Sequence, residues 1–249
     1  MRTSSVAHDR TPVIIGVGEA SERIDAPDYA ALSPADLAAA AARAAVADTG
    51  ATGPVLEAID VIAAIRQFEV SGPGFNAPFG CSNNFPRSVA NRIGARPDRA
   101  VWEKVGGQGP QHLVNEFAHA IADGHADTVL LVGSEAISTV RHLTGLGQTR
   151  DWAETVDGDV EDRGYGLEGL LTSELARHGA RTPIHLYALF ENARRARLGL
   201  DRSRYIQTMG ALFAPFTAVA ATNPHAMAPE QLTASEIADI TSSICSDVI

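Results

Sequence analysis

Cysteine is scarce in this chain, which has only Cys81 and Cys245 among its 249 residues. Two thiols so far apart in the sequence predict neither a disulfide framework nor a C-x-x-C metal site. We therefore interpret each as an ordinary buried or loop cysteine. Such low cysteine use is typical of a reducing compartment and favours a cytoplasmic location.

Long apolar runs are also missing. No stretch approaches the roughly 18 apolar residues that a membrane-spanning helix requires. The first residues, MRTSSVAHDRTPV, are polar and lack the apolar run of a secretory signal peptide. These absences predict a soluble protein with no membrane partner.

The chain has few basic residues. Its 20 lysines and arginines are outnumbered by 30 acidic residues, which gives a net charge of −10. Nucleic acids and anionic membranes attract clustered basic residues, so neither is expected as a partner. With 45% hydrophobic and 20% charged residues the chain can bury a sizeable core. Its length favours one large α/β domain, or one domain with an insertion.

Apolar runs alternate with helical patterns over the first 135 residues. Helices are predicted from a Ser33 N-cap to Asp48, and over Pro86–Ile93 and Pro110–Asp123, with a long loop over Phe68–Phe85. This alternation predicts βαβ units, and so an α/β fold with a mostly parallel sheet flanked by helices. The predicted strands are Val13–Val17, Ile59–Ile65, Ala100–Val105 and Thr128–Val132.

After Glu135 the pattern changes. Residues 141–165 are polar and show no strand pattern. We expect an α/β domain over 1–135 and a mostly helical loop or cap region over 136–249, lying over the carboxyl ends of the strands. The final residues, ITSSICSDVI, become more apolar without a helix cap, so we expect further chain or a partner to follow. The helices predicted in this region are Leu167–His178, Ile184–Leu198, Arg202–Asn223 and Ser235–Ile244.

A glycine-rich turn, Gly106-Gly107-Gln108-Gly109-Pro110, joins a predicted strand to a predicted helix, and it contains no Cys, Ser or Thr. Its glycines permit positive φ and close backbone approach, and Pro110 suits a first helical turn. The free N–H groups of that helix start favour an anion or a developing oxyanion. The alternative is a tight connection without a ligand. Nucleotide binding is not favoured, since the third glycine of G-x-G-x-x-G is missing.

Three segments taken in order, PVIIGVGE, VWEKVGGQGPQHLVNEFAHAIADG and DTVLLVGSEA, resemble the N-terminal half of a thiolase. The resemblance is strongest to sterol-carrier-type and thiolase-like proteins, often labelled acetyl-CoA acetyltransferases. It extends into PIHLYALFENARRARLGL and AVAATNPHAMAP, and so covers most of the chain. It implies a thiolase-like fold, a place in lipid metabolism, and CoA or acyl-CoA as ligand with no further cofactor.

Two departures from the thiolase pattern matter for function. Thiolases carry a nucleophilic Cys at the start of this helix, and alignment of the turn places Gly106 there. The second thiolase half, with its own catalytic residues, has no counterpart in this sequence. The resemblance then implies a CoA-binding protein without cysteine-based thiolysis, acting as a homo-oligomer or with a chain that supplies the second half. A thiolase-like retro-aldolase with a small partner protein, and a half that only dimerises, remain alternatives.

Other candidate residues are weaker. Arg194, Arg195 and Arg197 suit the phosphates of CoA, although a solvated helix face is the alternative. His112 and His119 share a helix face without a suitably spaced carboxylate, so no metal site is predicted. The acidic run Asp157–Asp162 lacks calcium-loop spacing and predicts a solvated loop. The isolated histidines, predicted to have no catalytic role, are His142, His178, His185 and His225.

Overall fold

The structure is a computed structural model of the chain and describes residues 9–72, 75, 77–166, 172–180 and 183–239. The chain divides into two compact units, Met1–Leu170 and Leu171–Ile249. The boundary predicted from the sequence lies earlier, after residue 135. With the division after Leu170, the polar segment over 141–165 falls within the first unit.

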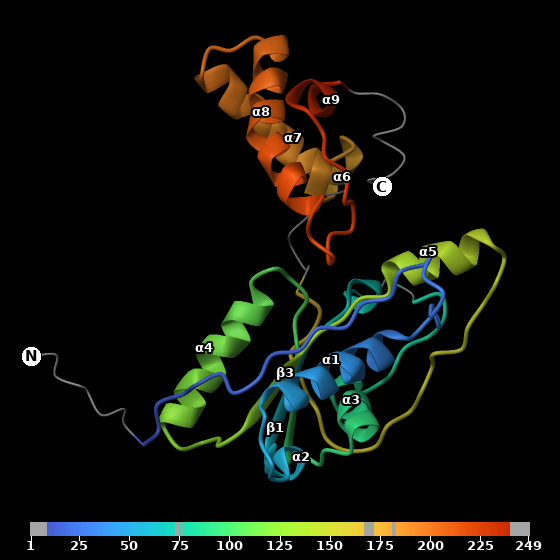
Figure 1. Cartoon of the computed structure of the whole chain (residues 1–249), viewed down its shortest axis with the longest axis vertical. Coiled ribbons are helices and arrows are strands. Elements are labelled where there is room, and N and C mark those ends of the chain that lie inside the picture. Colours follow the sequence, from blue (N-terminus) through green and yellow to red (C-terminus); the bar gives the residue numbers. More distant parts are fainter. Residues whose placement is uncertain (1–8, 73–74, 76, 167–171, 181–182, 240–249) are drawn as a thin grey trace, which may run out of the picture. The chain divides into compact units, whose positions relative to one another are not determined.

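A four-stranded parallel sheet organises the first unit (Figure 1). Its strands β1 (Val61–Ile65), β2 (Arg99–Glu103), β3 (Val129–Val132) and β4 (Glu161–Asp162) lie in the order β3-β1-β2-β4. Every pairing is parallel, so each connection crosses over the sheet and the carboxyl ends of the strands meet at one edge. The predicted α/β fold with a parallel sheet is confirmed.

Helices cover both faces of this sheet (Figure 1). The helices α1 (Pro34–Asp48) and α3 (Phe85–Ile93) pack on one face, and α4 (Gly109–Ala122) packs on the other. All three were predicted to within one residue at each end. The first unit also contains α2 (Val55–Ala58), the 3-10 helix η1 (Phe68–Val70) and α5 (Ile137–Gly145).

Strand β1 contributes to both cores. Ile62 and Ala64 pack with the α1 and α3 residues, whereas Val61 and Ala63 pack with Phe117 of α4. Successive side chains of a strand point to opposite faces, so a strand covered on both sides is apolar throughout. This explains why its short apolar run identified β1 correctly.

The two helices of the first face begin with side-chain caps. The Ser33 hydroxyl accepts a hydrogen bond from the backbone N–H of Asp36, as the predicted N-cap requires. At α3 the Asn84 side chain accepts from the N–H of Arg87. Such caps satisfy N–H groups that have no partner within the helix.

The segment Val13–Val17 is not a strand, and that prediction is wrong. Its aliphatic side chains are exposed, and the N–H of Val17 donates to Asp48 Oδ2 at 2.9 Å rather than to a strand. A β-carbon on Gly16 or Gly18 would overlap backbone atoms of α1. The glycines thus let an extended segment run closely against a helix, and an aliphatic run alone does not distinguish that arrangement from a strand.

Strand β4 lies in the segment that was predicted to contain no strand. It pairs Glu161 with Val101 of β2, and the chain before it follows the loop at Phe79, whose carbonyl accepts from Trp152 N at 2.6 Å. A strand of two acidic, exposed residues has no apolar alternation, so its sequence pattern could not reveal it.

The described part of the second unit is helical. Its helices agree with the predicted segments, except that residues 167–171 and 240–244 lie outside the described residues. Within the described ranges, no helix is long and apolar enough to cross a bilayer. The helices are α6 (Ser173–Arg177), α7 (Pro183–Arg197), α8 (Arg202–Ala220) and α9 (Ala234–Ala238).

Candidate functional site

The carboxyl edge of the sheet gathers polar groups from separate segments. Gln67 follows β1, the glycine turn follows β2, and Glu135 follows β3. The N–H of Phe68 donates to Glu135 Oε1 at 2.9 Å, which links the chain beyond β1 to the chain beyond β3. Open parallel sheets bind their ligands at this edge.

Gly106 and Gly109 of the glycine turn differ in why the backbone favours glycine there. Gly106 has a φ of +147°, a conformation that residues with a side chain rarely adopt. Gly109 begins α4 without positive φ, but a β-carbon there would lie 3.0 Å from Ile65 Cδ1. Positive φ is thus confirmed at Gly106, whereas at Gly109 the close approach of Ile65 leaves little room for a side chain.

The start of α4 faces a carboxylate. Glu103 Oε1 accepts from the N–H of Lys104 at 3.0 Å, and Oε2 lies 3.2 Å from His112 Nδ1. Glu103 is itself buried. An incoming anion would meet this charge, so the helix start suits a neutral acceptor such as a carbonyl oxygen better than a second carboxylate.

Arg163 is the centre of an ion-pair network beside this turn. Its guanidinium lies 2.6 Å from the carboxylates of Glu103 and Glu116, and 2.7 Å from that of Glu161. Hydrogen bonding from Arg163 lowers the pKa of Glu116, and the same bond raises the pKa of Arg163. These four residues, with Arg99, form what we term the Arg163 cluster.

Two glutamates of the Arg163 cluster, together with His112, are groups of the kind that hold metal ions. One ligand atom from each of Glu103, His112 and Glu116 lies within 4.8 Å of the others. Neither carboxylate was predicted as a partner of His112, although Glu116 is only one helical turn beyond it. Because Arg163 already supplies positive charge to both glutamates, we interpret the group as an ion-pair network.

The acidic run at 157–162 is a solvated loop only in its first part. Glu161 and Asp162 form β4, and their carboxylates pair with Arg99 and Arg66. The Arg66 guanidinium carbon lies 3.7 Å from the centroid of the Trp102 ring. The prediction of a solvated loop is therefore wrong for the last two residues.

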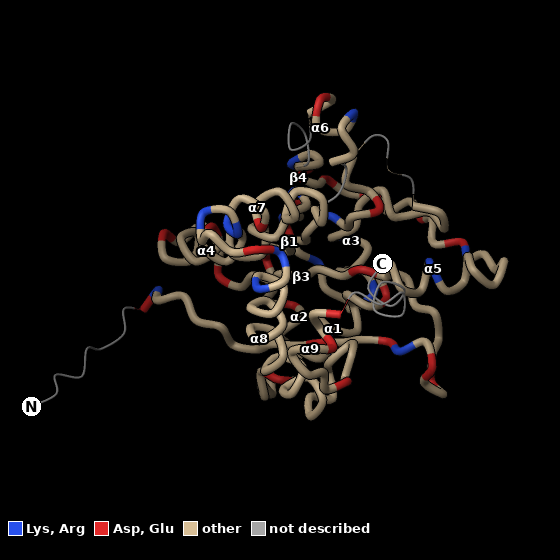
Figure 2. Tube along the Cα trace, turned by 90° about the horizontal axis from the view of Figure 1, so that it is seen from above, with Lys and Arg blue, Asp and Glu red and all other residues tan. Residues whose placement is uncertain are grey.

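The arginines proposed for CoA lie in the last turn of α7. Arg194 and Arg197 are exposed, and Arg195 donates to the carbonyl of Leu200 at 3.0 Å. Cations at a helix carboxyl end also interact favourably with its dipole. Figure 2 shows that basic residues lie among acidic ones along the described chain. A role in phosphate binding stays a prediction.

The remaining candidate residues do not come together. Cys81 is exposed in the loop before α3, and Cys245 lies outside the described residues. His178 pairs with Glu174 at 3.0 Å on its own helix, and the ring of His142 contacts that of Tyr29 edge to face. His119 lies on α4, and His185 and His225 belong to the second unit.

The chain matches a solved structure of a known protein. No family model matches the chain, and no curated protein matches it. The chain is similar to the crystal structure of a monomeric SCP2-thiolase-like protein type 1 from Mycobacterium smegmatis, with 38% sequence identity and a TM-score of 0.69. The match covers 96% of this chain and 41% of that one. The chain thus has a thiolase-like fold and spans less than half of that protein's length.

Proposed function

We propose that this chain is an SCP2-thiolase-like protein of the acetyl-CoA acetyltransferase type that binds CoA or acyl-CoA without cysteine-based thiolysis. The observation that carries the proposal is Gly106, which stands where thiolases place their nucleophilic cysteine. A glycine offers no side chain to form a thioester, and its φ of +147° disfavours any other residue. The helix start that remains suits a neutral acceptor atom of the ligand.

Binding is the first testable consequence. Calorimetric titration with CoA and with acetyl-CoA should give saturable heat at or below millimolar ligand. If the α7 arginines contact phosphate, the Arg194→Ala/Arg197→Ala variant should bind more weakly, because it loses charge-assisted hydrogen bonds.

The matched control is Arg96→Ala, since Arg96 is exposed and lies in the first unit. Its titration should equal that of the wild type. The absence of heat with both ligands would contradict the proposed function, and equal binding by all three proteins would remove the arginines from it.

The second consequence concerns the missing nucleophile. In the 249-residue chain, Gly106→Cys is expected to gain no acetoacetyl-CoA thiolysis, because a cysteine alone does not provide the proton-transfer groups that thiolases use. It should also lose about 1–3 kcal/mol of unfolding free energy through its positive φ. A β-carbon there would lie 2.6 Å from Gln108 Oε1, so that side chain must move.

Gly106→Ala is the control, since it has the same backbone strain without a thiol. Thiolysis by Gly106→Cys above the Gly106→Ala background would show that the site is more complete than we propose. Urea denaturation of both variants separates strain from chemistry.

The other hypotheses make different predictions in the same assays. Cleavage of a β-hydroxyacyl-CoA with a co-purified partner would favour the retro-aldolase. A stable dimer in light scattering, without heat from either CoA ligand, would favour a half that only dimerises.

A further inference from the structure

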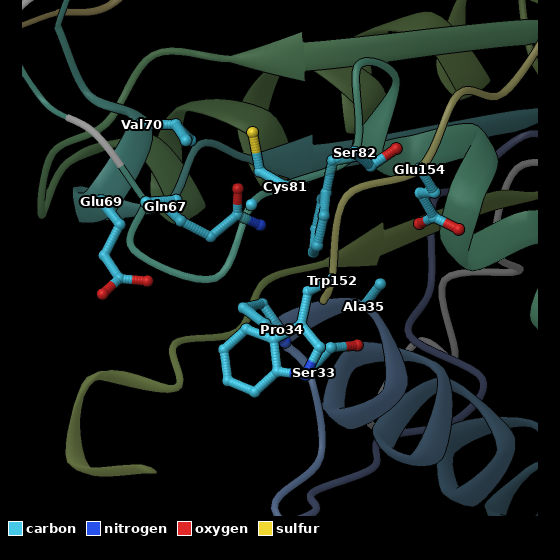
Figure 3. A pocket seen from close by; sticks show the side chains of 13 residues that line it. Ser33, Pro34, Ala35, Gln67, Glu69, Val70, Cys81, Ser82, Trp152 and Glu154 are labelled. Atoms are coloured by element: carbon cyan, nitrogen blue, oxygen red, sulfur yellow. The ribbon is translucent and has the colours of Figure 1, made fainter. Parts of the chain in front are cut away.

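A small pocket lies where α1 and α3 begin, apart from the glycine turn (Figure 3). Its lining includes Ala35 of α1, Phe85 of α3, Gln67 after β1, and Trp152. The cavity volume is about 30 Å³, which is about the share of one water molecule in the liquid. We call it the Gln67 pocket, and it admits a small group rather than a whole ligand.

The side chain of Gln67 gives this pocket a defined chemistry. Gln67 is only 6% exposed, and its Nε2 is buried with no hydrogen-bond partner among the described residues. Figure 3 shows the amide extending between the other lining side chains, toward Cys81. A buried N–H without a partner is unfavourable, so the pocket calls for an acceptor atom.

Two helix starts add to the same preference. Ala35 and Phe85 lie in the first turns of α1 and α3, helices of 15 and 9 residues. The N-terminal end of a helix carries the positive part of its dipole. The Ser33 and Asn84 caps already pair N–H groups at both starts, so it is the dipoles that favour an oxygen atom in the Gln67 pocket.

The occupant must also be partly apolar and neutral. Pro34, Val70 and Trp152 line the cavity, whereas a buried water needs two to four polar partners. Burial raises the pKa of the nearby Glu69 carboxyl, so a further negative charge would be unfavourable. Burial raises the pKa of Cys81 as well, which keeps it a thiol.

We propose that the Gln67 pocket binds the carbonyl oxygen of a small, neutral acyl group, with Gln67 Nε2 as hydrogen-bond donor. The acyl group as ligand rests on the proposed function. The pocket lies at the same carboxyl edge as the glycine turn, so it would hold the acyl end of the ligand. Cys81 lines the pocket and so reports its occupancy.

The test follows alkylation of Cys81 by iodoacetamide in the full chain, with peptide mass spectrometry to separate Cys81 from Cys245. The probe is pentan-2-one, a ketone that cannot acylate a thiol and has no nucleotide. It should slow labelling of Cys81 in a saturable way. 2-Methylpent-1-ene, which has a CH₂ group in place of the ketone oxygen, should protect about fivefold less well, in line with one lost hydrogen bond.

Gln67→Leu should bring protection by the ketone down to that of 2-methylpent-1-ene, while Gln148→Leu, at an exposed glutamine, should behave as wild type. Gln67→Leu removes an unpaired donor, so its thermal midpoint should not fall. Equal protection by both probes, or by wild type and Gln67→Leu, would overturn the proposal and leave a water site only. Because the probe lacks CoA, failure here is distinct from failure of the CoA titration.

Discussion

Replacing Arg163 by methionine is expected to lower the free energy of unfolding by about 3 kcal/mol, as measured by urea denaturation at neutral pH. The substitution keeps an apolar stem of similar length but removes the cation between three glutamates. Glu103 is 7% exposed at its side chain, so its charge would be left buried without its closest partner. Removing one partner of a buried pair costs more than the pair contributes.

Arg96→Met is the control, because it makes the same change at an exposed position and should stay within about 0.5 kcal/mol of the wild type. The pH dependence gives a second check. The folded pKa of Glu116 is lowered by Arg163, so its contribution is present above the unfolded pKa and is lost as the pH falls through the folded value. The difference between wild type and Arg163→Met should therefore shrink as the pH falls below the usual pKa of a glutamate. A difference independent of pH would exclude this ion-pair account.

Gly80→Ala is expected to destabilise the protein by about 3 kcal/mol, and Gly94→Ala by only about 1 kcal/mol. Both glycines have nearly the same positive φ, +81° and +80°, so a side chain is disfavoured by φ at both positions. At position 80 a β-carbon would lie 2.8 Å from the backbone nitrogen of Ala153, whereas at position 94 nothing lies within 4 Å.

The pair of substitutions compares the steric contributions, because the chemical change and the φ angle are matched. Chemical denaturation of the two variants gives the difference directly. Equal losses would mean that the loop at Gly80 moves away from Ala153 at no cost. Gly80 lines the Gln67 pocket, so the first variant should also change the labelling rate of Cys81.

The parts of the fold that follow from sequence are those whose pattern is local. The cap at Ser33 and the apolar run of β1 each depend on neighbouring residues, and both were predicted. Strand β4 and the extended Val13–Val17 segment depend on what packs against them. Strand β4 has no strand pattern in its sequence, and the apolar run of Val13–Val17 fits either a strand or an extended segment on a helix.

The candidate site also has a part that follows from local sequence and a part that does not. The glycine turn is contiguous, so its backbone role could be predicted, although only the structure separates positive φ at Gly106 from packing at Gly109. The Arg163 cluster joins β2, α4 and β4, and the Gln67 pocket joins segments around residues 34, 67, 81 and 152. No spacing along the chain relates such residues, because the parallel sheet brings them together.

The strand pairing also sets an order for folding during synthesis. Val101 of β2 pairs with Glu161 of β4, a residue 60 positions later, so one side of β2 stays open while that length is translated. At roughly 5–20 residues per second this takes on the order of 3–12 s. Throughout that interval one edge of β2 is unpaired, and such an edge can pair with another nascent chain. The yield of folded protein should therefore depend on chaperone supply and growth temperature more than on the stability of the finished sheet.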